Sequence, residues 1–284
     1  MTSSIHIRSM TAADLPFAVQ RIAEVGWLIE DRANLDGYFI HDPQGCLLAE
    51  VEGKPVGICT ATSYGKSGFI GKLIVSPEAR GQGVGAALLN YGVDYLRRGG
   101  ADTAYLDGVL KAAPMYERNG FRKLCRSLRF NGRLAGREHG DVRPMLPADL
   151  PAVCALDQPL FGGDRSFFLA RRLSLYPDMC YVLVEGGAIA GYIVGRRGDG
   201  WQAAGPWVTA ETVKEPVKLL ESFAYHLGDL PFGIGVLEAN TAAITLVRSL
   251  GFQERDYLWR MANGPAEDLG MSPGCLAVGT AAKG

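Results

Sequence analysis

The chain has 284 residues, of which 48% are apolar, and its formal net charge is −1. This length fits two domains of ordinary size, and the balanced charge leaves no basic surplus for a phosphate backbone, so we expect no nucleic-acid partner. The start of the chain has no basic, then apolar leader, and no apolar run reaches about 18 residues, so we expect a cytoplasmic protein with no membrane partner.

Cysteine and histidine give no sign of a metal site. The six cysteines and four histidines are scattered along the chain, and no two cysteines form a C-x-x-C pair. The histidines also lack the spacing of metal ligands. We therefore expect reduced structural thiols and no metal cofactor.

The chain contains an internal repeat. Residues 7–16 read Ile-Arg-Ser-Met-Thr-Ala-Ala-Asp-Leu-Pro, and residues 142–151 read Val-Arg-Pro-Met-Leu-Pro-Ala-Asp-Leu-Pro. Two shorter matches follow in the same order: Val51-Glu52-Gly53 with Val184-Glu185-Gly186, and Gly120-Phe121 with Gly251-Phe252. Three matches in order predict a duplicated domain.

The domain boundaries follow from this repeat. Residues 131–140 are rich in Gly and Arg with little apolar periodicity, as is typical of a linker. We predict a first domain at 1–135 and a second at 139–264. The tail at 265–284 either frays or adds a final strand through Cys275-Leu276-Ala277-Val278.

The first copy begins with strands and a helix. Thr11 to Asp14 resemble a helix cap, with Pro16 tolerated in the first turn. The turn at 52–54 joins two apolar runs as an antiparallel hairpin. The strands we predict lie at 5–7, 47–51, 55–62, 69–75 and 104–106.

A long helix follows a glycine-rich loop. Apolar residues recur at spacings of three and four, and Gly99 can end the helix. The residues of this stripe are Val84, Leu88, Tyr91 and Tyr95. A short helix at 115–119 is closed by Gly120. Together these elements predict a mixed α/β fold.

The glycine loop is a candidate phosphate site. Arg80-Gly81-Gln82-Gly83-Val84-Gly85-Ala86 joins a strand to a helix start. Glycines allow positive φ and close approach of a ligand, and the first N–H groups of a helix can bind a pyrophosphate. Arg80 can add a charge-assisted contact.

Other interpretations of the loop were weighed. It could be a flexible turn with a surface arginine. It also fits the dinucleotide fingerprint G-x-G-x-x-G/A, with Asp102 about 20 residues later. However, the loop follows a hairpin rather than the first strand of a βαβ unit. A P-loop is excluded, because Thr60 stands where the glycine upstream of Gly65-Lys66-Ser67 is needed.

The block Tyr116-Glu117-Arg118-Asn119-Gly120-Phe121 separates these alternatives. With the strand at 73–75, the loop pattern R-x-x-G-x-G and the amphipathic helix, it resembles the GNAT superfamily of N-acetyltransferases over about the first 130 residues. The resemblance implies tandem GNAT-like folds, each with a mixed, mostly antiparallel sheet flanked by helices. Gly26-Trp27 and the second copy are similar to a two-domain subgroup.

The resemblance implies how acetyl-CoA would bind. The backbone of Leu73, Ile74 and Val75 would pair with the pantetheine arm like an added strand, and the Val75 N–H would polarise the thioester carbonyl. The loop residues Arg80, Gly81, Gln82, Gly83, Val84, Gly85 and Ala86 would hold the pyrophosphate. Many members carry an Asn seven residues before the tyrosine, but this chain has Val109 there.

The resemblance also implies catalytic residues. Tyr116 would donate a proton to the leaving thiolate, although it could instead only pack beneath the sheet. Asp107 is the candidate base that takes the proton of the ammonium acceptor, with Glu30, Asp31 and Asp36 as alternatives. Trp27, Glu30 and Asp31 are candidate acceptor-binding residues, and each could equally be an ordinary core or surface residue.

The second copy keeps the frame but not the chemistry. Val247 stands where Tyr116 stands in the first copy, and residues 205–211 contain no R-x-x-G-x-G pattern. Pro206 lacks a backbone donor, and Glu211 would repel a pyrophosphate. We expect this copy not to bind acetyl-CoA productively, but to wall the acceptor pocket or to form a homodimer interface.

The expected function is transfer of an acetyl group from acetyl-CoA to a primary amine of a small molecule, by direct attack in a ternary complex. Three alternatives stay open: a protein lysine or N-terminal acetyltransferase, a non-catalytic acyl-CoA sensor, and a dinucleotide-binding oxidoreductase.

Overall fold

The structure is a computed structural model, and it describes residues 4–26, 32–198, 201–228, 230–265 and 268–284. Trp27, Glu30 and Asp31 therefore lie outside the described residues. The chain forms two compact units. The first contains Met1–Leu124, Trp259–Glu267 and Ala281–Lys283, and the second contains Cys125–Leu258, Asp268–Thr280 and Gly284. The expected boundaries divide the chain once, whereas each unit contains three separate segments.

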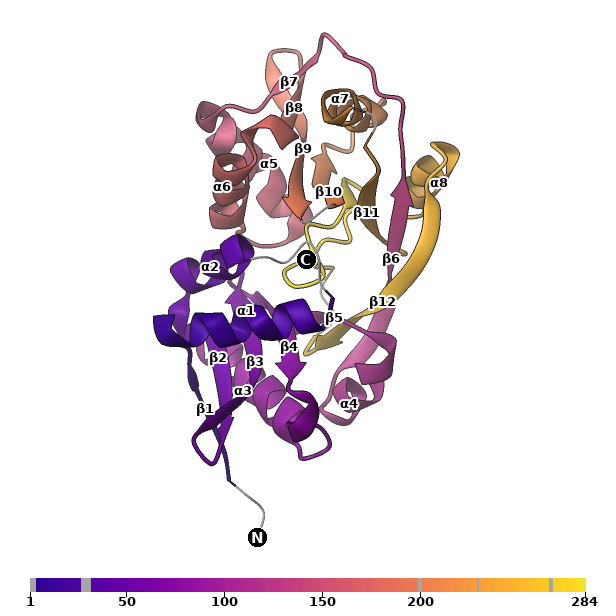
Figure 1. Cartoon of the computed structure of the whole chain (residues 1–284). Coiled ribbons are helices and arrows are strands. Elements are labelled where there is room, and N and C mark those ends of the chain that lie inside the picture. Colours follow the sequence, from indigo (N-terminus) through magenta and orange to yellow (C-terminus); the bar gives the residue numbers. More distant parts are fainter. Residues whose placement is uncertain (1–3, 27–31, 199–200, 229, 266–267) are drawn as a thin grey trace. The chain divides into compact units, whose positions relative to one another are not determined.

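The first unit is a mixed sheet with helices (Figure 1). Its strands are β1 (Ile5–Ser9), β2 (Cys46–Val51), β3 (Lys54–Ser63), β4 (Ser67–Val75), β5 (Thr103–Gly108) and the end of β12 (Gln253–Asn263). Its helices are α1 (Leu15–Glu24), α2 (Arg32–His41), α3 (Val84–Arg98) and α4 (Ala113–Arg118). Neighbouring strands are antiparallel except β4 and β5, which are parallel.

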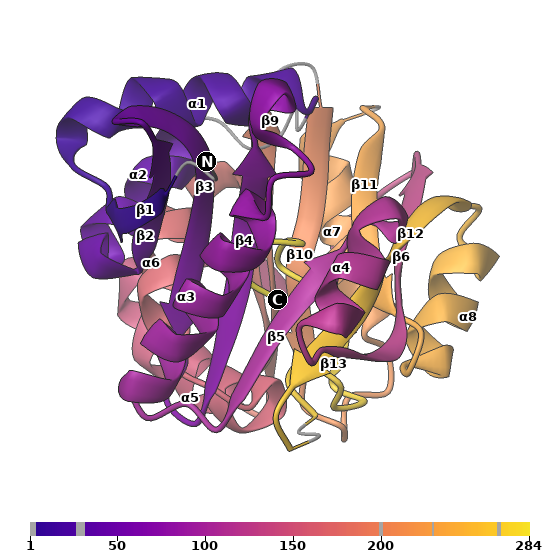
Figure 2. The same ribbon diagram turned by 90° about the horizontal axis from the view of Figure 1, so that it is seen from below.

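The second unit repeats this order (Figure 2). Its strands are β7 (Val142–Pro144), β8 (Cys180–Glu185), β9 (Ala188–Gly198), β10 (Trp201–Thr209), β11 (Phe232–Leu237), β13 (Cys275–Ala277) and most of β6 (Arg122–Gly132). Its helices are α5 (Leu150–Phe161), α6 (Ser166–Leu175), α7 (Val217–Leu227) and α8 (Thr241–Ser249). Again only one pair, β10 with β11, is parallel.

The two copies exchange their last strands. In the first unit β5 pairs with β12, from Trp259 opposite Gly108 to Asn263 opposite Ala104. In the second unit β11 pairs with β6, from Phe232 opposite Gly132 to Leu237 opposite Ser127. Each unit therefore takes one strand from the other copy, which is why a single cut between the copies does not describe the units.

The predicted elements of the first copy are confirmed. The four N-terminal strands lie within one or two residues of their expected ends, and the helix from Val84 ends at Arg98 before Gly99. Its apolar stripe packs on β3 and β4, with Leu88 and Val84 buried in the core. Helix α2 was not predicted, because Arg32–His41 carries no clear apolar stripe. The tail forms the strand alternative, as β13.

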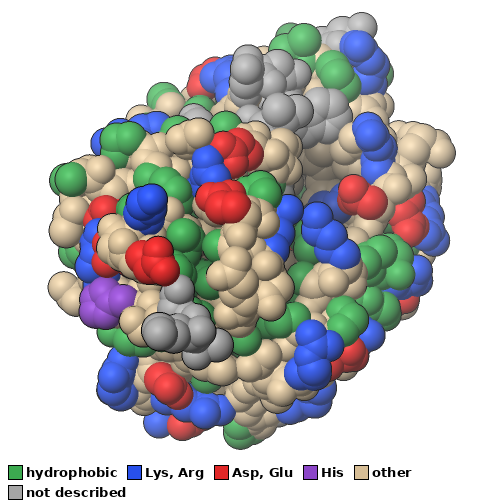
Figure 3. Space-filling view, turned by 60° about the horizontal axis from the view of Figure 1, so that its bottom comes forward, with side chains coloured by type: hydrophobic (Ala, Val, Ile, Leu, Met, Phe, Trp, Pro, Cys, Tyr) green, Lys and Arg blue, Asp and Glu red, His purple; other side chains and the backbone are tan. Residues whose placement is uncertain are grey.

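Acidic and basic side chains are interspersed on the face shown in Figure 3, and its described residues form no continuous basic area. Such a surface does not create the strong single-sign potential that attracts a polyanion. In the described part of the chain, no helix is long and apolar enough to cross a membrane. No group of three or more metal-ligating side chains occurs among those residues either.

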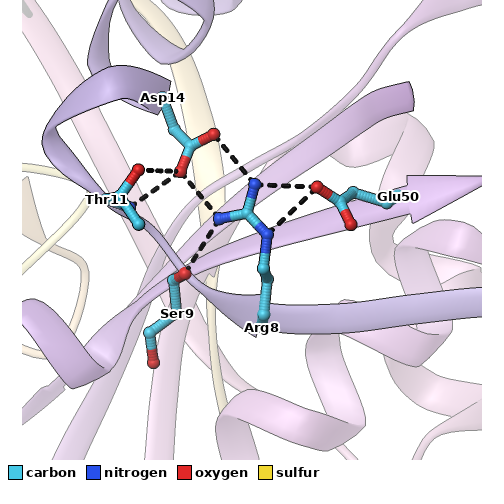
Figure 4. A network of polar contacts seen from close by, with 5 residues as sticks. All are labelled: Arg8, Ser9, Thr11, Asp14 and Glu50. Atoms are coloured by element: carbon cyan, nitrogen blue, oxygen red, sulfur yellow. Dashed lines mark hydrogen bonds and ion pairs between the residues drawn. The ribbon is translucent and has the colours of Figure 1, made fainter. Parts of the chain in front are cut away.

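The repeated N-terminal motif builds the same ion pair in both units. Arg8 donates to both carboxylate oxygens of Asp14 at 2.7 and 3.0 Å, and Asp14 accepts the Thr11 N–H at the start of the helical segment (Figure 4). In the second unit Arg143 donates to Asp149 at 2.7 and 2.8 Å. The Arg and Asp of the motif thus fix the entry from the first strand into the first helix.

Candidate active site in the first unit

Strands β4 and β5 separate after a short paired stretch. Their register runs only from Ser67 opposite Thr103 to Phe69 opposite Tyr105, although β4 continues to Val75 and β5 to Gly108. Beyond this point the facing edge of β4 is not paired with β5. The resulting gap lets an extended ligand add to β4 as a strand would.

A bulge in β4 lies beside this gap. The β3–β4 register shifts between Ile58 and Thr60, where β4 has one more residue than β3. Lys72 lies in this bulge with φ of 48°, a left-handed value that is uncommon for a residue with a side chain. The bulge bends β4 and increases its twist, which is consistent with its separation from β5.

The end of β4 leads into the glycine loop. Gly81 and Gly83 have φ of 77° and 85°, and Gly83 is the N-cap of α3. A Cβ at either glycine would meet nothing within 4 Å, so the backbone there is open to a ligand. The first N–H groups of α3 have no partner within the helix and lie at the positive end of its dipole. The loop can therefore hold a phosphate group.

Two loop side chains bond back to the backbone. Arg80 is exposed, and its Nε donates to the Val75 carbonyl at 3.0 Å. Gln82 donates to the Glu78 carbonyl at 2.9 Å. These bonds fix the loop between β4 and α3, and they leave the two terminal guanidinium nitrogens of Arg80 available for a charge-assisted contact.

Tyr116 lies at the end of β5. Its side chain is buried, and its ring lies so close to Gly108 that a Cβ there would come within 2.6 Å of it. The hydroxyl has no hydrogen-bond partner among the residues that the structure describes. Burial raises the pKa of Tyr116, with a smaller contribution from the nearby Cys59. The phenol therefore stays protonated at neutral pH, as a proton donor must.

Asp107 is in a different environment from the one expected of a base. Its side chain is fully buried, and Arg260 Nε of β12 donates to its Oδ1. Arg260 is also fully buried, with its guanidinium 5.2 Å from the centre of the Phe69 ring. A carboxylate held in a buried ion pair is poorly placed to take a proton from an acceptor. Asp107 thus positions β5 against β12.

Other candidates for the acceptor side are less informative. Asp36 lies on α2, where it accepts from Arg32 Nε at 2.6 Å. The structure therefore brings Tyr116, the β4 backbone and the glycine loop around one gap, and places Asp36 in a helix-surface ion pair. None of these residues tests the acceptor-binding roles expected for Trp27, Glu30 and Asp31.

Two buried cations near the gap were missed by the sequence analysis. Lys72 is 1% exposed, and its Nζ lies 5.2 Å from the centre of the Tyr38 ring on α2. Arg260 comes from the second copy but belongs to the first unit. The available signal was a single charged residue inside an apolar run, in Gly71-Lys72-Leu73 and in Trp259-Arg260-Met261.

The comparisons with known proteins agree with this geometry. Residues 12–121 match the Acetyltransferase (GNAT) family, and residues 153–270 match an Acetyltransferase (GNAT) domain. The chain belongs to the GNAT superfamily of acetyltransferases, with two domains of that family in tandem.

Two relatives are named mycothiol acetyltransferase. The one from Stackebrandtia nassauensis is 34% identical over 118 residues, which are 38% of this chain and 39% of the relative. The one from Acidimicrobium ferrooxidans is 38% identical over 88 residues, 28% of each chain. The matched part thus spans about two fifths of the first relative.

Solved structures share the fold over nearly the whole chain. A candidate acetyltransferase from Pyrococcus horikoshii has a TM-score of 0.81 at 23% identity and covers 99% of this chain and 96% of its own. A tandem GNAT protein from the clavulanic acid biosynthesis pathway has a TM-score of 0.61 at 14% identity, over 93% of this chain and 100% of its own. At these identities the likeness concerns the fold alone.

Proposed function

We propose that the first unit transfers an acetyl group from acetyl-CoA to the primary amine of a small molecule. The observation that carries this proposal is the gap between β4 and β5, because it leads directly into the open glycine loop and has Tyr116 at its side. Acetyl-CoA needs three things from a protein: a partner for its amide-bearing arm, donors for its phosphates and a proton for its leaving thiolate. This gap offers all three.

Each group has a separate task in this proposal. The free edge of β4 from Leu73 to Val75 binds the pantetheine arm, and the Val75 N–H donates to the thioester carbonyl as negative charge develops there. The N–H groups of the loop from Gln82 to Ala86, with Arg80, bind the pyrophosphate. Acetyl-CoA supplies the activated acetyl group.

Tyr116 holds the proton that the thiolate needs. A thiol has a pKa of about 8.5, and an ordinary phenol has one of about 10. Since burial raises the pKa of Tyr116 further, the phenol is protonated whenever the acceptor amine attacks. The amine must be neutral to attack, and the residues at positions 27–36 are the nearest source of a base on the acceptor side.

The acceptor is a small molecule in this proposal. The two relatives named mycothiol acetyltransferase favour such an acceptor over a protein lysine or N-terminus. A panel assay separates these possibilities. Purified chain and acetyl-CoA would be given small primary amines of the mycothiol type, and in parallel a lysine-containing peptide. Faster release of free CoA with the peptide than with every small amine would contradict the small-molecule assignment.

The cofactor site is tested with a charge in the loop. Gly83→Asp places a carboxylate at the N-terminus of α3, and we expect acetyl-CoA affinity measured by calorimetry to fall about tenfold or more. Gly83→Asn is the matched control, because it has the same shape and the same positive φ without the charge. We expect this control to keep most of the affinity. Equal losses in both variants would show that the loop does not bind the phosphates.

A further inference from the structure

The second unit has the same gap, but the chain itself fills it. Strands β10 and β11 pair only from Gln202 opposite Phe232 to Ala204 opposite Ile234. Beyond this point β13 lies against β10, with Trp207 opposite Ala277 and Val208 opposite Cys275. On the other side, the Val278 N–H donates to the Gly235 carbonyl of β11 at 2.8 Å. We call residues 273–278 the plug segment.

The plug segment meets β10 where β4 would meet its ligand. Val75 of β4 lies opposite Gly57, and Thr209 of β10 lies opposite Gly191, the repeat partner of Gly57. Both strands also have their bulge at the same place in this register. The Thr209 N–H donates to the Gly274 carbonyl at 2.9 Å. Thr209 therefore binds a chain carbonyl with the amide that corresponds to that of Val75.

A side chain also recognises the amides of the plug segment. Asn240 Nδ2 donates to the Pro273 carbonyl at 2.9 Å and to the Cys275 carbonyl at 3.1 Å. Its Oδ1 accepts the Ala243 N–H at 2.9 Å and so caps α8. Asn240 is 5% exposed, so both of its functions are performed in a buried setting. A buried donor aimed at two carbonyls is selective for an amide chain.

Three glycines allow this close approach. A Cβ at Gly205 would lie 2.2 Å from the Val278 carbonyl oxygen, and one at Gly274 would lie 2.4 Å from the Thr209 carbonyl oxygen. A Cβ at Gly235 would lie 2.7 Å from the Val278 side chain. Glycine at all three positions shapes the slot to the backbone of an extended chain rather than to side chains.

We propose that the plug segment is a built-in substitute for the pantetheine arm, and that the slot beneath it binds pantetheine-type ligands when the segment is displaced. Pantetheine is an extended chain with two amides, and the slot offers the Thr209 N–H, the Asn240 amide and the Gly235 carbonyl to such a chain. The ligand class excludes the nucleotide part of CoA, because the segment between β10 and α7 lacks a glycine loop and contains Glu211. This inference rests on the cofactor role proposed for the gap in the first unit.

The test is amide hydrogen exchange, read by mass spectrometry, on the full chain with S-acetylpantetheine. Val278→Pro removes the N–H that bonds to Gly235, whereas Val278→Ala keeps it and serves as the matched control. We expect exchange at Thr209 and in the plug segment to rise about tenfold in Val278→Pro and to change little in Val278→Ala. Added S-acetylpantetheine should then slow exchange at Thr209 again.

A second substitution shows whether this protection is specific. Asn240→Asp keeps the acceptor that caps α8 but loses the amide donor. Combined with Val278→Pro, it should abolish the protection at Thr209. Protection that is absent in Val278→Pro, or that persists in the double variant, would overturn the proposal. In both cases slower exchange at Gly83–Ala86 would show that the first unit still binds the ligand, so that failure of the proposed function is distinguished.

The wild-type chain provides a measurement that does not depend on a folded variant. If ligand and plug segment compete for one slot, S-acetylpantetheine at high concentration should speed exchange at Val278 while Thr209 stays protected. If exchange at Val278 does not respond at any ligand concentration that saturates the first unit, the plug segment is a permanent strand and the proposal is wrong.

Discussion

The gaps beside β4 and beside β10 share a backbone design but differ in what borders them. Each follows a parallel pairing of three residues and a bulge at the same place in the register. In the first unit the gap leads to the glycine loop and Tyr116, and in the second it is occupied by β13, with Val247 at the tyrosine position. The fold thus supplies the gap, whereas a few loop and side-chain positions decide what binds there.

The largest effect that sharpens this comparison concerns one buried ion pair in each unit. Asp107 pairs with Arg260, and Asp157 pairs with Arg165 at 2.7 Å, all with side chains no more than 6% exposed. Removing one partner leaves a buried charge, so Asp107→Asn and Asp157→Asn should each lower the free energy of unfolding by about 3–5 kcal/mol. Urea denaturation followed by tryptophan fluorescence measures this.

An exposed pair provides the control for these two variants. Lys66 and Asp102 lie 3.5 Å apart with side chains 83% and 58% exposed, so Asp102→Asn should cost less than about 1 kcal/mol. The folded fraction of Asp107→Asn should transfer acetyl groups at a rate within about tenfold of wild type. A loss of about 100-fold at unchanged acetyl-CoA affinity would instead restore Asp107 as the base.

The next effect separates a catalytic hydroxyl from a structural one. Tyr116→Phe should lower kcat by about 100-fold without changing acetyl-CoA affinity, because it removes only the proton donor. Tyr192→Phe in the second unit should leave kcat unchanged but lower stability, since the Tyr192 hydroxyl donates to the buried Asp157. Steady-state kinetics and urea denaturation on both variants check this. The reverse pattern would assign the hydroxyls wrongly.

The raised pKa of Tyr116 adds a pH dependence to that prediction. Since the folded-state pKa lies above the ordinary value of about 10, deprotonation of this tyrosine should not reduce kcat between pH 7 and about 10. A pH–rate profile with a chemically equivalent acceptor of low amine pKa measures this. An alkaline loss of kcat below pH 9 that disappears in Tyr116→Phe would contradict it.

Much of the first copy could be predicted from the sequence because local signals there agree. Apolar alternation located β1 to β4, the stripe from Val84 located α3, and positive-φ glycines marked the loop. The exchange of β6 and β12 could not be predicted, because both strands carry the same pattern and nothing local states which copy each one pairs with. For the same reason the sequence could not show that Asp107 meets Arg260, a residue far along the chain.

The plug segment shows a second limit of sequence reasoning. The tail was expected either to fray or to form a strand, and its pattern could not decide where that strand would add. Asn240 was visible as a residue, but its bonds to Pro273 and Cys275 depend on tertiary placement. Short apolar segments specify a strand, whereas their partner is specified by an unpaired edge elsewhere in the fold.

The smallest effect compares the repeated Arg–Asp motif in its two settings. Asp14 accepts bonds from Arg8, the Thr11 N–H and the Thr11 hydroxyl, and Arg8 also donates to Glu50. Asp149 accepts from Arg143 and the Leu146 N–H, but leucine offers no hydroxyl. Asp14→Asn should therefore lower stability by about 1 kcal/mol more than Asp149→Asn.

The acid limb of the stability curve provides the readout for this difference. The Arg8 and Arg143 hydrogen bonds hold the pKa values of Asp14 and Asp149 below the ordinary value of about 3.9. A carboxylate with a lowered folded-state pKa contributes stability above its unfolded pKa and loses it as the pH falls through the folded value. Urea denaturation from pH 6 to pH 3 should therefore show a steeper acid loss in wild type than in Asp14→Asn, with Asp149→Asn in between. Equal slopes in the two variants would mean that the Thr11 and Glu50 contacts add nothing to the first copy of the motif.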